Sequence, residues 1–271
     1  MTVGARSGAT GGPAGGPAGP AEDAAIRAGE LRHNLADVRA RIATAARAAG
    51  RDPATLTLIA VSKTWPATDV VTMAGLGVDE FGENRDQEGH PKSVAVATAR
   101  SAAGADAVTW HFIGRLQRNK ARAVASWADW IHSVDRESLV SGLEAGAAAA
   151  GRTPRVCIQV SLDPSGDGPA AGSGGPTRGG VAPEAVDRIA ELVAQAPHLR
   201  LAGVMAVAPF GRPARPAFAR LRVVRDRLLA DHPGATVISA GMSGDLADAI
   251  AEGATHLRVG TALFGHRPRF P

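Results

Sequence analysis

Lysine is scarce in this chain, and one lysine lies where an amine could do chemistry. Of 271 residues, 30 are lysine or arginine, but only Lys63, Lys92 and Lys120 are lysines. Lys63 ends the apolar run LTLIAVSK at 56–63. An amine that is partly desolvated at a strand end has a lowered pKa, and its neutral form can attack a carbonyl carbon. The alternative is a surface lysine whose side chain reaches from the strand end into water.

Two short segments near the C-terminus could bind an anion. The segment SAGMSGD contains Gly241, Met242 and Ser243, and the segment RVGTALFG contains Gly260 and Thr261. Small residues before a helix leave backbone N–H groups and hydroxyls free to contact phosphate. Either segment alone could simply be a tight strand-to-helix turn, with the serine as an ordinary N-cap. Because the two segments end successive strands, the pair favours a phosphate site.

The elements that must position these residues follow a repeating pattern. Eight apolar, strand-like runs alternate with helical patterns, which indicates a parallel α/β sheet; eight repeats at this length predict a single (β/α)8 TIM barrel. An amphipathic pattern at 24–49 predicts an extra N-terminal helix. The runs cover residues 56–63, 79–84, 108–114, 130–135, 155–163, 201–208, 236–243 and 256–265. The later helical patterns cover 67–76, 87–100, 117–126, 138–150, 183–196, 214–231 and 244–252.

A closed barrel would bring the candidate residues together. Active sites of such barrels lie at the C-terminal ends of the strands, and the first strand neighbours the last when the barrel closes. Lys63 would then face the two anion-binding segments, which describes a pocket for a phosphorylated aldehyde such as pyridoxal phosphate. Arg258 lies two residues before Gly260 and shares its orientation. It could face the pyridine nitrogen and disfavour protonation of the ring.

Four other residues on the predicted strands have more than one interpretation. Glu83 could be an acid–base partner of Lys63 or only an ion-pair partner. His111 and His132 fit hydrogen-bonded core or rim residues better than catalysts. Cys157 lies in the middle of a strand and is interpreted as a small buried apolar residue.

Two segments fall outside the barrel pattern. Residues 1–22 are rich in Gly, Pro and Ala and predict a disordered tail, which leaves 23–271 as the barrel domain. The Gly- and Pro-rich stretch 163–180 is either a lid or a mobile insertion, and its composition favours an insertion. The N-terminus lacks the apolar core of a signal peptide, and no apolar run is long enough to span a membrane. We therefore expect a cytoplasmic protein.

The composition excludes several kinds of chemistry. The chain has no tyrosine and one cysteine, so a tyrosine base, an internal disulfide and a Cys-rich zinc site are excluded, and we expect no metal site. The pI near 10.1 is typical of nucleic-acid-binding proteins. The formal charge is only +4, however, and the high pI follows from arginine usage in a chain without tyrosine. Nucleic-acid binding is therefore not favoured.

Several motifs in a fixed order resemble the pyridoxal phosphate homeostasis protein family over residues 31–267. They are AVSKTWP, FGENRDQE, WHFIGRLQRNK, an Arg-Gly-Gly triplet, GVMAVAP, SAGMSGD and RVGTALFG. The resemblance implies a barrel similar to the N-terminal domain of alanine racemase. Family members are regarded as carriers or regulators of vitamin B6 without an established reaction. We therefore expect a non-catalytic monomer, with enzymes that use the cofactor as candidate partners.

The resemblance also implies a set of cofactor contacts. Pyridoxal phosphate would be held in aldimine linkage by Lys63, with its phosphate on the segments that contain Ser243, Gly260 and Thr261, and its ring near Asn84 and Arg258. One departure from the family is Arg178, where relatives usually have a lysine. Amine chemistry at that position is therefore not expected.

Two enzymatic alternatives remain open on the sequence. A racemase or decarboxylase of the same fold is one, but alanine-type racemases use a tyrosine as second base, and the related decarboxylases use a cysteine from a second domain. A Schiff-base aldolase acting on a phosphorylated sugar is the other. Its lysine typically lies on a later strand, and the predicted strands five to eight contain no lysine.

Overall fold

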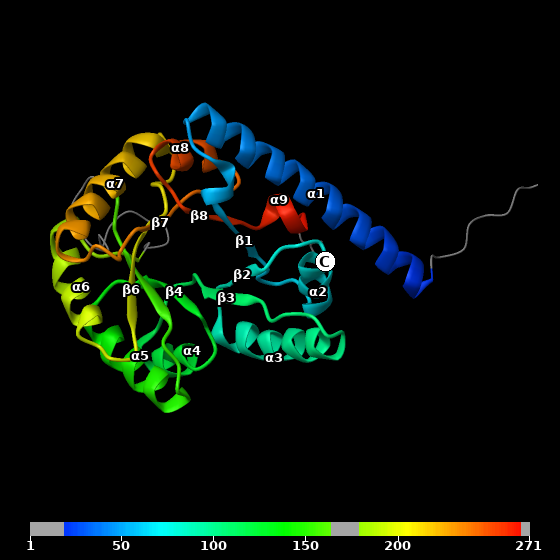
Figure 1. The fold of residues 1–271 in the computed structure, drawn as a ribbon, viewed down its shortest axis with the longest axis horizontal. Helices are drawn as coiled ribbons and strands as arrows, with labels where there is room; N and C mark the ends of the chain where they lie inside the picture. Colours follow the sequence, from blue (N-terminus) through cyan, green and yellow to red (C-terminus); the bar gives the residue numbers. More distant parts are fainter. Residues whose placement is uncertain (1–18, 164–178, 267–271) are drawn as a thin grey trace, which may run out of the picture.

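The structure, a computed structural model, describes residues 19–163 and 179–266. Eight parallel strands close into a barrel in the order in which they occur in the chain, which confirms the predicted TIM barrel (Figure 1). The strands are β1 (Thr57–Val61), β2 (Glu80–Glu83), β3 (Thr109–Phe112), β4 (Trp130–Val134), β5 (Arg155–Gln159), β6 (Arg200–Met205), β7 (Val237–Ser239) and β8 (His256–Val259). Each of the eight predicted runs overlaps one strand that is shorter than the run, and β6 begins one residue before its run.

Helices surround the barrel and follow the predicted alternation. They are α1 (Pro20–Ala48), α2 (Ala67–Gly75), α3 (Asp86–Ala102), α4 (Ala121–Ala125), α5 (Glu137–Ala150), α6 (Val186–Ala194), α7 (Ala214–Asp231), α8 (Leu246–Ala251) and α9 (Thr261–Phe264), with 3-10 turns η1 (Pro53–Thr55), η2 (Arg118–Lys120) and η3 (Pro183–Ala185). The last predicted run, 256–265, is only partly a strand. β8 ends at Val259, Gly260 takes a right-handed helical conformation, and α9 follows at once. An apolar run alone does not distinguish a buried strand from a buried short helix.

The extra N-terminal helix is present and supports the C-terminal end of the chain. Its apolar stripe is fully or nearly buried and consists of Leu31, Leu35, Val38, Ile42 and Ala46. Asn34 Nδ2 donates to the Leu263 carbonyl at 3.0 Å, which ties α1 to α9. α1 begins at Pro20, so it includes three residues that the sequence assigned to the tail. Gly19 is the N-cap residue of α1, and residues 1–18 of the predicted tail lie outside the described residues.

The barrel interior is partly apolar and partly polar. Its apolar part is a small cluster of inward-facing side chains: Trp130, Cys157, Ala202, Met205 and Val237. Cys157 has no exposed surface, and burial raises the pKa of its thiol to about 12, so it is the inert buried residue that the sequence predicts. The larger apolar core lies outside the barrel, between the strands and the helices.

The long loop after β5 returns to the barrel through two glycines. Residues 164–178, which include Arg178, lie outside the described residues. Gln159 Nε2 donates to the Gly179 carbonyl at 2.6 Å, and Val181 forms a parallel bridge with Val160. A Cβ on Gly180 would lie only 2.6 Å from the Ser161 nitrogen, so the returning chain needs glycine there.

Within residues 19–163 and 179–266, no helix combines the length and the apolar character that crossing a bilayer requires.

Candidate functional site

The C-terminal ends of β7, β8 and β1 lie side by side at the mouth of the barrel. β8 pairs with β1 through Arg258 and Ile59, and the Arg258 amide donates to the Gly241 carbonyl at 2.9 Å. A Cβ on Gly260 would lie 3.3 Å from the carbonyl oxygen of Val61. Both glycine segments therefore lie close to the end of β1, where Lys63 follows.

Four backbone N–H groups at this edge have no acceptor among the described residues. They belong to Ser243 and Gly244, which follow β7, and to Thr261 and Ala262, which begin α9. The hydroxyls of Ser243 and Thr261 lie on the same two turns. We call Ser243, Gly244, Thr261 and Ala262 the backbone cradle. Unpaired N–H groups on successive turns form a concave site for an anion with several acceptor oxygens, such as phosphate.

Met242 differs from its expected role in this cradle. Its N–H donates to Asp245 Oδ1 at 2.5 Å, so that donor already has a partner within the chain. α8 begins at Leu246 rather than near Gly244, and its N-cap position is Asp245. Ser243 is therefore not an N-cap, because the Asp245 carboxylate folds back over the turn and delays the helix. Gly241 has φ +92°, and a Cβ there would lie 2.7 Å from the Cβ of Ala249.

Lys63 is exposed, which corrects the expectation of a partly desolvated amine. The buried part of the apolar run ends before Lys63. β1 ends at Val61, and Ser62 is the last buried residue before the turn. Thr64 has φ +68°, in the left-handed region, and its N–H donates to the Glu88 carboxylate. The chain therefore turns sharply after β1 and leaves the Lys63 amine accessible to solvent.

Glu83 pairs with Lys92 rather than with Lys63. Its Oε1 lies 2.6 Å from Lys92 Nζ and accepts from Ser62 Oγ at 2.7 Å, and Lys92 Nζ also donates to the Ser62 carbonyl at 2.9 Å. Burial raises the pKa of Glu83, although Lys92 and Ser62 act in the opposite direction. The sequence did not single out Lys92. This buried network fixes Ser62, the residue directly before Lys63.

Arg258 is buried at the floor of the mouth. One terminal nitrogen donates to Ser239 Oγ at 2.7 Å and the other to the Ala206 carbonyl at 2.8 Å. Burial lowers the pKa of the guanidinium to about 10 despite the opposing effect of Asp245, so it stays charged at neutral pH. Arg258 is thus a fixed cation beneath the cradle.

A chain of hydrogen bonds runs from Arg258 through the barrel interior. Ser239 Oγ lies 2.9 Å from His132 Nδ1, and His132 Nε2 lies 2.9 Å from His111 Nδ1. His111 Nε2 lies 2.5 Å from Glu80 Oε2, at the opposite end of the barrel. Burial holds the pKa of His132 well below its usual value, with His111 and Arg258 adding to the effect. Both histidines are hydrogen-bonded core residues, as the sequence favoured.

The sequence did not reveal that these groups form one continuous chain. The sequence feature that could have indicated this chain is the two-residue period of the strands. Side chains in register on neighbouring parallel strands face the same side of the sheet. We call Glu80, His111, His132, Ser239 and Arg258 the interior chain. It holds Arg258 in a single orientation.

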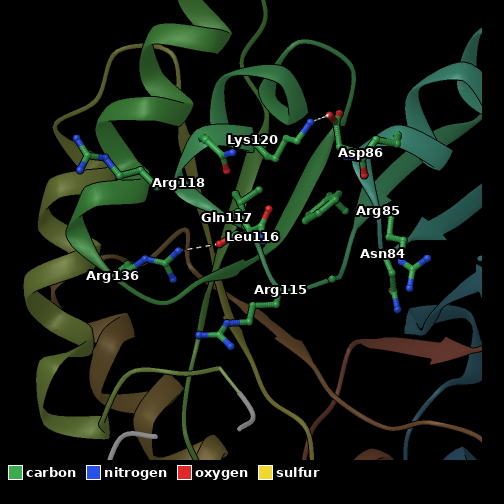
Figure 2. A pocket seen from close by; sticks show the side chains of 13 residues that line it. Asn84, Arg85, Asp86, Arg115, Leu116, Gln117, Arg118, Lys120 and Arg136 are labelled. Carbon is green, nitrogen blue, oxygen red and sulfur yellow. Dashed lines mark hydrogen bonds and ion pairs between the residues drawn. The ribbon is translucent and has the colours of Figure 1, made fainter. Parts of the chain in front are cut away.

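The opposite half of the mouth is built from charged side chains. Asn84 follows β2 and lines a cavity of about 860 Å³ near the ends of β2, β3 and β4 (Figure 2). A Cβ on Gly114 would lie 2.1 Å from the Asn84 carbonyl oxygen, so only glycine permits this approach of the two strand ends. The cationic residues of the lining are Arg85, Arg115, Arg118, Lys120 and Arg136. The sequence did not single them out as a group.

Comparison with known proteins decides the family. The family model described as alanine racemase, N-terminal domain, matches residues 26–268. The pyridoxal phosphate homeostasis protein of Pseudomonas aeruginosa is 44% identical over 237 residues, which cover 86% of this chain and 94% of the relative. The chain belongs to the pyridoxal phosphate homeostasis protein family. Another member, from Mycobacterium leprae, is 41% identical over 250 residues, covering 88% of this chain and 93% of the relative.

A solved structure of a similar protein agrees with the fold. PipY of Synechococcus elongatus, determined with pyridoxal phosphate bound, superposes with a TM-score of 0.71 at 34% identity. The match covers 87% of this chain and all of PipY. The resemblance to the pyridoxal phosphate homeostasis protein family that the motifs indicated is therefore confirmed.

Proposed function

We propose that this chain binds pyridoxal phosphate at the mouth of the barrel and holds it reversibly for other proteins, without turning over a substrate of its own. The observation that carries the proposal is the backbone cradle: four N–H groups without acceptors among the described residues, beside the exposed Lys63. Family membership supports the choice of cofactor, since PipY was determined with pyridoxal phosphate bound.

The residues present fit each part of the cofactor. The cradle N–H groups and the hydroxyls of Ser243 and Thr261 would hold the phosphate. The Lys63 amine would join the aldehyde carbon as a Schiff base, with one water released as the carbonyl oxygen leaves. Asn84, which follows β2, and Arg258, which lies in β8, flank β1 from either side and would contact the ring. When bound, the cofactor supplies an electron-withdrawing ring.

Arg258 makes storage a better fit than catalysis. Its guanidinium is fixed by Ser239 and Ala206 and remains charged at neutral pH, and a fixed cation beside the ring nitrogen would disfavour protonation of that nitrogen. A pyridine ring that stays unprotonated is a weaker electron sink. The chain also has no tyrosine to serve as the second base of a racemase.

The exposure of Lys63 is consistent with release. A linkage that water can reach hydrolyses without a conformational change of the protein, so the cofactor can be passed on to enzymes that lack it. We infer that such apoenzymes are the partners of this chain, that it acts as a monomer, and that it works in the cytoplasm.

The proposal is tested by loading the purified chain with pyridoxal phosphate. We expect a visible absorbance band that borohydride removes, and a reduced adduct on Lys63 in the peptide map. Lys63→Ala should lose the adduct, whereas Lys120→Ala, a control at a partly exposed lysine, should keep it. An adduct on another residue would contradict the assignment. Steady amino-acid turnover that is abolished by Lys63→Ala would instead establish an enzyme.

A further inference from the structure

The cavity beside Asn84 is far more cationic than the chain as a whole. Five of its 13 lining residues are arginine or lysine, compared with 30 of 271 in the sequence. Asp86 is its single acidic lining residue. The excess of positive charge is therefore concentrated in one hollow at the ends of β2, β3 and β4.

Three of these cations have no acidic partner among the described residues. Lys120 lies 3.7 Å from Asp86, and Arg136 lies 2.5 Å from Asp135. Arg85, Arg115 and Arg118 make no ion pair and no side-chain hydrogen bond with any residue in 19–163 or 179–266. The cavity thus presents three uncompensated guanidinium groups, all on exposed side chains.

The backbone that carries the arginines is held firmly. Gly114 lies against the Asn84 carbonyl, and Leu116 is 1% exposed. Arg136 donates to the Leu116 carbonyl at 2.8 Å, a bond drawn in Figure 2. Arg115 and Arg118 flank this anchored segment. A fixed backbone lowers the entropic cost of binding a ligand between these side chains.

We propose that this cavity binds a small anion with two or more linked phosphate groups. Guanidinium forks match the oxygens of phosphate in pairs, and separated forks match a chain of phosphates better than a single one. A volume of about 860 Å³ exceeds what one phosphate fills and falls within the range of small-molecule sites. Gln87, Gln117 and Asn119 line the same cavity and supply amides for hydroxyls or a heterocycle.

The cavity shares Asn84 with the proposed cofactor site, but the groups that would hold phosphate in the two sites differ in position and in chemistry. The cradle uses backbone N–H groups after β7 and β8, whereas the cavity uses side chains after β2, β3 and β4. The inference goes beyond the proposed function and stands without it. Two natural sources share the chemistry, nucleoside di- or triphosphates and inorganic polyphosphate, and the experiment separates them.

The test is calorimetric titration of the full-length chain loaded with pyridoxal phosphate. ADP, ATP, tripolyphosphate, AMP and orthophosphate are the probes. We expect ADP, ATP or tripolyphosphate to bind at least about tenfold more tightly than AMP and orthophosphate, with affinity falling as salt rises. ATP tighter than tripolyphosphate identifies a nucleotide site, and the reverse order identifies a polyphosphate site; both support the proposal.

Variants of exposed arginines connect the binding to the cavity. Arg115→Ala and Arg118→Ala should each weaken binding of the tightest probe about tenfold. Arg32→Ala, an exposed arginine on α1 outside the cavity, should leave it unchanged. The absorbance band of the bound cofactor should persist in all three variants, so a failure of this proposal is distinguishable from a failure of cofactor binding.

Several outcomes would overturn the proposal. Absence of binding by every linked phosphate, or AMP and orthophosphate binding as tightly as ATP, would do so. Equal loss of affinity in Arg32→Ala would show that the charge acts non-specifically. Binding of a glutamate-rich peptide in place of the phosphates would reassign the cavity to an acidic segment of another protein.

Discussion

The two halves of the barrel mouth are suited to anions in opposite ways. After β7 and β8 the chain offers backbone N–H groups on glycine-rich turns, with one buried arginine beneath them. After β2, β3 and β4 it offers flexible arginine side chains around an open hollow. After β7 and β8 the donors are backbone groups, so the fold fixes their positions. After β2, β3 and β4 the fold fixes only the backbone from which the long arginine side chains extend.

This difference bears on selectivity. Backbone donors cannot move to suit a ligand, so the cradle fits one compact dianion in one place, as a cofactor phosphate requires. Guanidinium groups on exposed side chains adapt to phosphates at several spacings. We therefore expect substitutions on the cradle side to disturb folding and cofactor binding together, and substitutions of the exposed arginines to leave folding intact.

The largest effect should come from the buried Glu83–Lys92 pair, which lies between the two halves of the mouth. Lys92→Met leaves the buried Glu83 carboxylate without its cation, and we expect the free energy of unfolding to fall by about 4 kcal/mol. Urea unfolding monitored by tryptophan fluorescence measures it. Lys120→Met, at the exposed side of the cavity, should change stability by less than about 0.5 kcal/mol. Equal losses of stability in Lys92→Met and Lys120→Met would contradict the distinction between the buried Glu83–Lys92 pair and the exposed side of the cavity.

The next effect tests the rigidity of the cradle side. Gly241→Ala places a Cβ at φ +92° and 2.7 Å from the Cβ of Ala249, so we expect a loss of about 3 kcal/mol in stability together with weaker cofactor binding. Gly234→Ala, outside the cradle, is the control, because a Cβ there meets nothing within 4 Å. Unfolding curves and cofactor titrations of both variants check the prediction. If Gly241→Ala behaves like Gly234→Ala, the turn is not rigid.

A smaller effect is a pH dependence of stability that comes from His256, a buried residue in the barrel interior beneath the cradle. Burial, reinforced by His111, lowers the pKa of His256 to about 4, so the folded chain holds it neutral while the unfolded chain binds a proton. Stability contributed by His256 is therefore present above about pH 6.5 and is lost as pH falls toward 4, by about 2 kcal/mol at pH 5. Unfolding free energies at pH 8 and pH 5 measure this loss.

His256→Asn should reduce that pH dependence, whereas His33→Asn, at a histidine whose side chain is 76% exposed, should not. A wild-type chain whose stability is the same at both pH values would contradict the buried neutral state of His256.

The smallest effect sharpens the chemistry of the cradle. Thr261→Val removes one hydroxyl but keeps the backbone N–H, so cofactor affinity should fall about fivefold, or about 1 kcal/mol. Thr261→Ser keeps a hydroxyl and should bind nearly as tightly. Titration by absorbance compares the two. A loss of a hundredfold or more would mean that the hydroxyl, rather than the backbone, holds the phosphate.

Local sequence patterns were enough to predict the barrel and the place of its mouth. The eight runs, the N-terminal helix and the glycines at Gly241 and Gly260 follow from short-range periodicity and turn chemistry. The closure of the sheet then puts Lys63 near both glycine segments. These features could be read from the sequence because each depends on neighbouring residues in the chain.

Contacts between side chains from different elements could not be predicted from local sequence patterns. The contact of Glu83 with Lys92 and the interior chain from Glu80 to Arg258 depend on strand register and on which side chains meet after closure. The exposure of Lys63 depends on the left-handed turn at Thr64, a residue whose type does not favour that conformation. The arginine cavity gathers residues from three separate loops.

The central claim is that the phosphate of the cofactor lies on the backbone cradle and not among the arginines. A crystal structure of the chain loaded with pyridoxal phosphate and reduced by borohydride tests it most directly. We predict a covalent link to Lys63 and phosphate oxygens within hydrogen-bond distance of the amides of Ser243, Gly244, Thr261 and Ala262. A phosphate bound between Arg115 and Arg118, with the cradle amides left free, would contradict the account.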